Sequence, residues 1–179
     1  MADRSSSSTL PDGPSTLQKR RAGYTATTFV LGAMMVLAAV DALPSVAIFG
    51  VDAQTTRARA SGIDLEVTYG EVSRPALATP FDIEVHQEGG FDGPVRVAVD
   101  QEYLRMWDEN GLVPAPSAET VMGPWVVWEF DPPVGDTLFV SYDARIEPAA
   151  QEGRGGAVAV LDADDAVVVQ VDFTTRVWP

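Results

Sequence analysis

The sequence of 179 residues contains no cysteine, one histidine and one lysine. Without cysteine the chain has no disulfide framework, no Cys-ligated zinc and no thiol nucleophile. A serine nucleophile needs a histidine or lysine base, but Lys19 lies in a polar N-terminal segment and His86 has no partner at HxH, HxxE or HExxH spacing. We therefore expect a protein that is not an enzyme and that uses no cofactor and no metal.

Positive charge is also scarce, and it is spread unevenly. Residues 52–179 contain 23 acidic and 8 basic side chains, a net charge of −15, whereas residues 1–28 carry a net charge of +2. A surface that acidic repels phosphate backbones, so the composition disfavours nucleic-acid binding.

The N-terminal third divides into a polar tail and an apolar run. Residues 1–23 are rich in serine, proline and glycine, and we predict a disordered tail. Residues 24–51 are long enough, as a helix, to cross a hydrocarbon core of about 30 Å. The basic cluster Lys19, Arg20 and Arg21 precedes this run, so the positive-inside rule places the tail in the cytoplasm. We predict one transmembrane helix, with the acidic remainder outside the plasma membrane.

A cleavable signal peptide is the competing interpretation of the same segment. Small residues at Ser45 and Ala47, or at Ala53, suit a cleavage site. Apolar residues resume after Pro44, however, and the segment before the basic cluster is long for a signal peptide. Both interpretations export the domain that follows.

Asp41 and Pro44 interrupt the apolar run. A lone carboxylate near the bilayer centre costs roughly 2.5 to 3.5 kcal/mol on insertion scales. Asp41 either begins a signal-peptide cleavage region or contacts a polar or basic group on a partner span. Alternatively, it is tolerated because Pro44 disrupts the helix and admits water, or because Asp41 is protonated and bonds within its own chain. We favour the contact with a partner span, with Gly32 and Ala38 among the small residues that permit close helix approach.

After residues 52–61, which we interpret as a linker, apolar and polar residues alternate with period two. This alternation is typical of half-buried strands, and turn clusters such as EGGFDG and DPPVGD separate the strands at the intervals of a β-sandwich. The sequence therefore predicts an all-β, immunoglobulin-like sandwich over residues 62–179. The expected strands are 63–69, 81–86, 95–99, 126–130, 138–146, 167–173 and one beginning at Gly156.

The stretch from Gln101 to Val121 is less regular. EYLRMWDENG suits a short helical turn, and GLVPAPS contains too much proline for an interior strand, so we predict a loop there.

The run PPVGDTLFVSYDARIEP, residues 132–148, resembles a recurring feature of bacterial immunoglobulin-like domains, in which a proline-glycine turn leads into a long alternating strand. The whole arrangement of basic tail, single span and small β-domain is also similar to a group of single-pass membrane proteins from high-GC bacteria. The excess of arginine over lysine fits such a genome. These resemblances imply an extracytoplasmic scaffold and bring no catalytic residues.

Two acidic clusters are candidate cation sites, but neither has the ligand spacing of an EF-hand loop. Aspartate and asparagine are also the residues that tight turns select, so we interpret both clusters as turns. The clusters are Asp162, Asp164 and Asp165, and Asp108, Glu109 and Asn110.

Large aromatic residues are numerous for a small domain. Tyr103, Trp107 and Trp125 are candidate interface aromatics, because exposed rings stack on sugars or form the centre of protein interfaces. The competing interpretation, which we favour, is that such residues close the ends of the core, since they bury a large apolar area.

These features together predict a non-enzymatic single-pass accessory subunit. It would present an acidic domain outside the membrane and pair with an integral membrane protein in the lipid bilayer. The alternative is an exported binding module for a cell-wall glycan or a small ligand. A hydrolase ranks last, because a base and a nucleophile are both missing.

Overall fold

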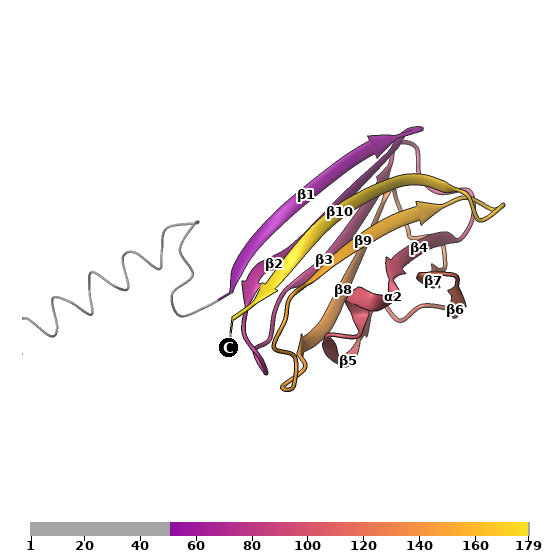
Figure 1. Ribbon diagram of the computed structural model, residues 1–179. Coiled ribbons are helices and arrows are strands. Elements are labelled where there is room, and N and C mark those ends of the chain that lie inside the picture. Colours follow the sequence, from indigo (N-terminus) through magenta and orange to yellow (C-terminus); the bar gives the residue numbers. More distant parts are fainter. Residues whose placement is uncertain (1–50, 179) are drawn as a thin grey trace, which may run out of the picture. The chain divides into compact units, whose positions relative to one another are not determined.

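The computed structural model of the protein describes residues 51–178, and these residues are mainly β-strand (Figure 1). The all-β class expected from the sequence is therefore confirmed. Within this described part, no helix has the length and hydrophobicity needed to span a bilayer. The disordered tail and nearly all of the predicted transmembrane helix lie outside the described residues. The same is true of Lys19, Arg20, Arg21, Gly32, Ala38, Asp41 and Pro44.

The described residues contain ten strands and one short helix. In chain order these elements are β1 (Asp52–Ala60), β2 (Ile63–Ser73), β3 (Phe81–Gln87), β4 (Val95–Asp100), α2 (Gln101–Leu104), β5 (Trp107–Val113), β6 (Ala118–Met122), β7 (Trp125–Phe130), β8 (Thr137–Ile146), β9 (Arg154–Leu161) and β10 (Val167–Val177).

The strands form one continuous sheet in the order β5-β8-β3-β2-β10-β9-β4-β7-β6, and β1 pairs with β2 outside this path. All neighbours are antiparallel except β2 and β10, which meet in parallel only at their C-terminal ends, where Val72 lies opposite Arg176. The sheet therefore has two halves joined at the β2–β10 contact. Its path ends at two strands, β5 and β6, that each pair on one side only.

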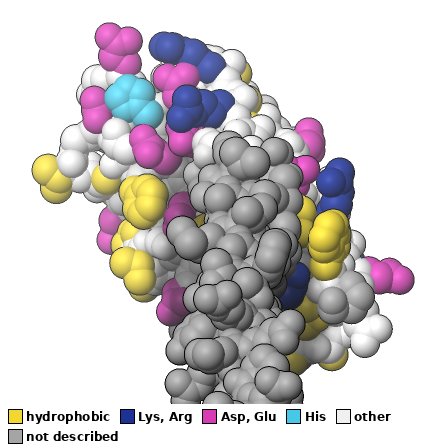
Figure 2. Space-filling view, turned by 90° about the vertical axis from the view of Figure 1, so that its left-hand side faces the viewer, with side chains coloured by type: hydrophobic (Ala, Val, Ile, Leu, Met, Phe, Trp, Pro, Cys, Tyr) yellow, Lys and Arg dark blue, Asp and Glu magenta, His cyan; other side chains and the backbone are white. Residues whose placement is uncertain are grey.

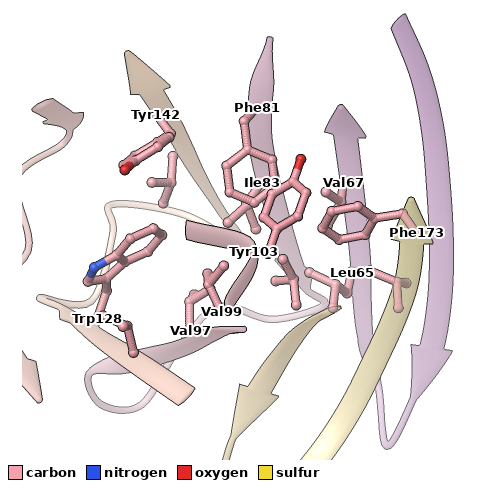
Figure 3. Packing of buried hydrophobic residues seen from close by; sticks show 14 of the residues in the cluster. Leu65, Val67, Phe81, Ile83, Val97, Val99, Tyr103, Trp128, Tyr142 and Phe173 are labelled. Carbon is pink, nitrogen blue, oxygen red and sulfur yellow. The ribbon is translucent and has the colours of Figure 1, made fainter. Parts of the chain in front are cut away.

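The sheet curls because each strand has one apolar face to bury. In β8, for example, Leu138, Val140 and Tyr142 are buried, whereas Phe139 between them is exposed. Buried side chains from both halves of the sheet meet in one core cluster (Figure 3). Burial of this common apolar surface, and not disulfides, holds the halves together.

Residues 52–61 do not form the linker that we expected from the sequence. Strand β1 occupies residues 52–60 and pairs along β2, with Ala60 opposite Ile63. The two residues between them, Ser61 and Gly62, both have positive φ angles, 51° and 81°. Two such residues are what a tight hairpin turn between twisted strands requires.

The irregular stretch contains more strand than the sequence predicts. Helix α2 provides the expected helical turn, and the Asp100 carboxylate caps it by accepting a hydrogen bond from the backbone N–H of Tyr103. The predicted loop GLVPAPS is only partly a loop, because its first three residues complete β5. Residues 118–122 then form β6, which the sequence analysis did not predict.

Candidate functional site

The two strands at the ends of the sheet path, β5 and β6, come to the same side of the core. Trp128 of β7 and Tyr142 of β8 stack with ring centroids 5.8 Å apart and an interplanar angle of 28°. Strand β7 is the only neighbour of β6, and β8 is the only neighbour of β5. The stacked pair therefore brings both edges to one region, which we call the seam and define as Glu109, Glu119, Val121, Trp128 and Tyr142.

Two carboxylates from different edge strands converge on the stacked rings of the seam. Trp128 Nε1 donates a hydrogen bond to Glu119 Oε2 at 3.1 Å, and the Tyr142 hydroxyl donates to Glu109 Oε2 at 3.4 Å. Burial raises the pKa of Tyr142 above its usual value, and the charges on Glu109 and Glu119 raise it further. The phenol therefore remains a protonated donor, and the two carboxylates give the seam a local negative charge.

Val121 adds an exposed apolar group to the seam. It lies opposite Val126, whose side chain belongs to the core, so its own side chain points to the same face of the sheet. Val121 is nevertheless 59% exposed. Strand β6 thus extends beyond the part of the core that the other half of the sheet covers.

The structure places two of the three candidate interface aromatics inside the core. Tyr103 is fully buried and Trp107 is 7% exposed, so neither presents a ring to a partner. The Tyr103 hydroxyl lies 3.0 Å from Thr175 Oγ1, and burial raises the pKa of this tyrosine. Both rings pack against Phe81. Their placement agrees with the competing interpretation, in which aromatics fill the core.

Trp125 lies on the opposite face of the sheet, as its position in the alternating pattern indicates. It is half-buried and packs with Met122 over a second, smaller apolar cluster. This cluster is a feature that the sequence analysis missed; two of its four buried members are alanines, which give a weak apolar signal. Its buried members are Ala98, Val127, Ala159 and Leu161.

A cavity of about 610 Å³ opens at the end of the sheet where β2 and β4 begin. Eight of its fourteen lining residues are apolar. Arg96 also lines the cavity; it donates through Nη1 to the Asp162 carbonyl at 2.9 Å and forms an ion pair with Asp165. The apolar lining residues are Ile63, Phe91, Pro94, Val95, Val160, Leu161, Ala163 and Val168.

The cluster at Asp162 is a turn, as the sequence predicts. One carboxylate oxygen of Asp162 accepts hydrogen bonds from the backbone N–H groups of Asp164 and Ala166, both at 2.9 Å. In residues 51–178, no three histidine, aspartate or glutamate side chains are grouped to hold a metal ion.

The other acidic cluster is not the turn that we predicted. Asp108 and Glu109 lie in strand β5, and a β-bulge falls between Glu109 and Gly111. Asp108 pairs with Arg145 on the adjacent strand at 2.6 Å, whereas Glu109 points into the seam. The prediction was wrong because it rested on the turn preference of aspartate and asparagine, whereas pairing with β8 holds these residues in a strand.

His86 lies beside a shallow hollow of about 540 Å³ on the outer face of β1, β2 and β3. Figure 2 shows basic and acidic side chains gathered around the histidine at one end of this face. His86 Nδ1 is 3.0 Å from Thr137 Oγ1 and 3.6 Å from an Asp136 carboxylate oxygen. The neighbouring arginines are paired as well, Arg57 with Glu66 at 2.6 Å. The arrangement is that of an exposed strand face with neutralised charges.

Comparison of the sequence with protein-family models gives no match, and comparison with curated proteins gives none either. The surfaces of this chain are therefore the basis for inferring its function.

Proposed function

We propose that the protein is a non-enzymatic accessory subunit that presents its acidic β-domain outside the plasma membrane and binds a membrane protein there. Residues 24–51 serve as its transmembrane helix, and the positive charge at Lys19, Arg20 and Arg21 keeps the tail in the cytoplasm. We assign the domain to the immunoglobulin-like sandwiches, on the grounds that two halves of an antiparallel sheet share one core.

The observation that carries the proposal is that the strands at the two ends of the sheet path, β5 and β6, each have an unpaired edge and an exposed apolar side chain. Val113 and Val121 are 66% and 59% exposed, and each lies in one of these strands. Unpaired strand edges with apolar side chains are surfaces that proteins normally shield, unless a partner covers them.

The charge of the domain indicates the kind of partner. Residues 52–179 carry a net charge of −15, which keeps copies of the domain apart and attracts a basic surface. In the membrane, Asp41 contacts a polar or basic group of the same partner, with Gly32 and Ala38 at the helix contact.

Copurification of the full-length protein from its native membrane tests this proposal. Wild-type protein should retain an integral membrane protein in mild detergent, and Asp41→Leu should lose it while remaining inserted. Asp41→Asn should lose less than Asp41→Leu if the contact is a hydrogen bond, and as much if it is an ion pair. If the Asp41→Leu variant retains every native partner, Asp41 does not form the proposed contact within the membrane.

A second candidate function, an exported binding module, is favoured by the cavity at the end of the sheet. Its volume of about 610 Å³ falls within the usual range for small-molecule sites, and its apolar lining suits a ring or acyl group. An apolar fluorescent probe should bind the full-length protein and should be displaced by a true ligand. Val168→Asp, which places a charge in the lining, should abolish probe binding, and unchanged binding would exclude this cavity.

A further inference from the structure

We propose that strand β6 and the seam bind an extended, basic segment of the partner, which adds to the sheet as a further strand. The inference rests on the proposed interaction function and names the surface and the chemistry of the partner.

Of the two strands at the ends of the sheet path, β6 is the more regular. Its five residues pair with β7 in an uninterrupted register from Ala118 to Met122, and they include neither proline nor lysine. Strand β5, at the other end of the path, is interrupted by a bulge after Glu109 and followed by Pro114. Bulges and prolines are features that block edge pairing, so an incoming strand would select β6 over β5. Strand β1 also pairs on one side only, but it carries Arg57 and Arg59, which disfavour a basic segment.

Side-chain parity determines which residues would face the added strand's side chains. Glu119 and Val121 are two residues apart and point to the same face, toward the seam. A neighbouring strand places its own alternate side chains on that face, beside them. A segment with a basic and an apolar residue two positions apart would therefore pair its cation with Glu119 and its apolar group with Val121.

Glu109 gives the seam a second carboxylate. It lies on the opposite edge strand but, like Glu119, it approaches the Tyr142 hydroxyl closely enough to raise the pKa of that group. Each carboxylate is already an acceptor for one buried donor, Trp128 or Tyr142, so both are held in place. Two fixed negative charges on one side of the bound strand favour a segment with more than one lysine or arginine.

A second copy of this chain is the less suitable occupant. Pairing β6 with itself would bring together two domains that each carry a net charge of −15, and would place one Glu119 near the other. A basic segment removes this repulsion.

Hydrogen exchange of the full-length protein in detergent micelles tests the proposal, with a short peptide of alternating lysine and valine as the probe. The peptide should slow exchange of the backbone amides in residues 118–122, and binding should weaken as salt is added. A peptide of alternating glutamate and valine should give no protection. Protection confined to other strands, or equal protection by both peptides, overturns the inference.

Variants with matched controls separate the contribution of the two carboxylates to peptide binding from that of the unpaired edge of β6. Glu109→Gln and Glu119→Gln keep an acceptor for their buried donors, and each should weaken peptide binding about threefold, whereas Glu152→Gln on an exposed turn should not. Val121→Lys should abolish binding by placing a charge on the edge, and Val134→Lys, fully exposed in a turn, should have no effect. Equal effects of the test and control variants overturn the inference.

Failure of this inference is distinguishable from failure of the proposed function. If the protein copurifies with a membrane partner but Val121→Lys retains that partner and the peptide protects nothing, the β6 docking surface is wrong and the accessory role stands. If no partner copurifies and the peptide does not bind, both are wrong.

Discussion

The indole of Trp128 stacks on the ring of Tyr142, although their strands are separated in the sheet order by β3, β2, β10, β9 and β4. The contact closes the curl of the sheet, because it joins the penultimate strand on one side to the penultimate strand on the other. It also brings Glu109 and Glu119, which come from the two edge strands, to one buried phenol. The seam therefore depends on this ring pair.

Removal of the indole should be far more costly than removal of the phenolic oxygen. Trp128→Ala deletes a buried aromatic side chain and should lower the free energy of unfolding by about 3–5 kcal/mol. Tyr142→Phe keeps the stacked ring and loses one long hydrogen bond, so it should cost about 1 kcal/mol or less. Urea unfolding of both variants measures the difference. Equal costs would show that the stack does not hold the two halves together.

Alkaline pH should destabilise the folded domain. Burial raises the pKa of Tyr103 and of Tyr142 above the value of about 10 in the unfolded chain, so the folded state keeps both protons longer. Their contribution to stability is complete below pH of about 10 and is lost as the pH rises beyond that value.

The urea midpoint should therefore fall above this pH, and it should fall less steeply in Tyr103→Phe than in the wild type. A steeper fall in the variant would contradict the assignment of the proton to the buried hydroxyl.

Two adjacent glycines in β9 should respond differently to alanine. A Cβ at Gly156 would lie 2.6 Å from two ring carbons of Tyr103, whereas a Cβ at Gly155 would meet nothing closer than 3.9 Å. Gly156→Ala should therefore lower the free energy of unfolding by about 1–3 kcal/mol through overpacking. Gly155→Ala should stay within about 0.5 kcal/mol of the wild type. Thermal unfolding of the pair checks the close packing of α2 against β9, and identical melting temperatures would argue against it.

Period-two alternation predicted most of the strands because burial on one face produces it directly. Strand β1 escaped prediction because threonine, arginine and alanine alternate there without a large apolar residue. The available signal was the Ser61-Gly62 pair, a two-residue turn ahead of a clear strand. Strand β6 was not predicted because four of its five residues are exposed, so it lacks the alternation of apolar and polar residues on which the prediction depends.

The candidate site was less predictable than the fold. Glu109 and Glu119 are ten residues apart on strands that do not pair with each other, and only the curl of the whole sheet unites them. The burial of Tyr103 and Trp107 was favoured from their size alone, because helix α2 interrupts the alternating pattern between β4 and β5. The convergence of the two glutamates and the burial of the two aromatic rings both depend on tertiary packing and not on the local sequence pattern.

The presence of β1 changes where the domain can be shortened. Pairing along β2 covers an edge that would otherwise be open, and Ala58 and Ala60 pack against the core. A chain that begins at residue 52 should therefore unfold at a higher temperature than one that begins at residue 62, and should aggregate less. Indistinguishable melting temperatures and solubility would show that β1 does not stabilise the sheet.

Native mass spectrometry of the full-length protein, extracted from its own membrane in a mild detergent, tests the accessory-subunit proposal most directly. The account predicts an uncleaved chain in a complex with a second, integral membrane protein at a fixed ratio. A chain that is found alone, with a mature N-terminus after Ala47 or Ala53, would contradict the account and leave the exported binding module as the better explanation.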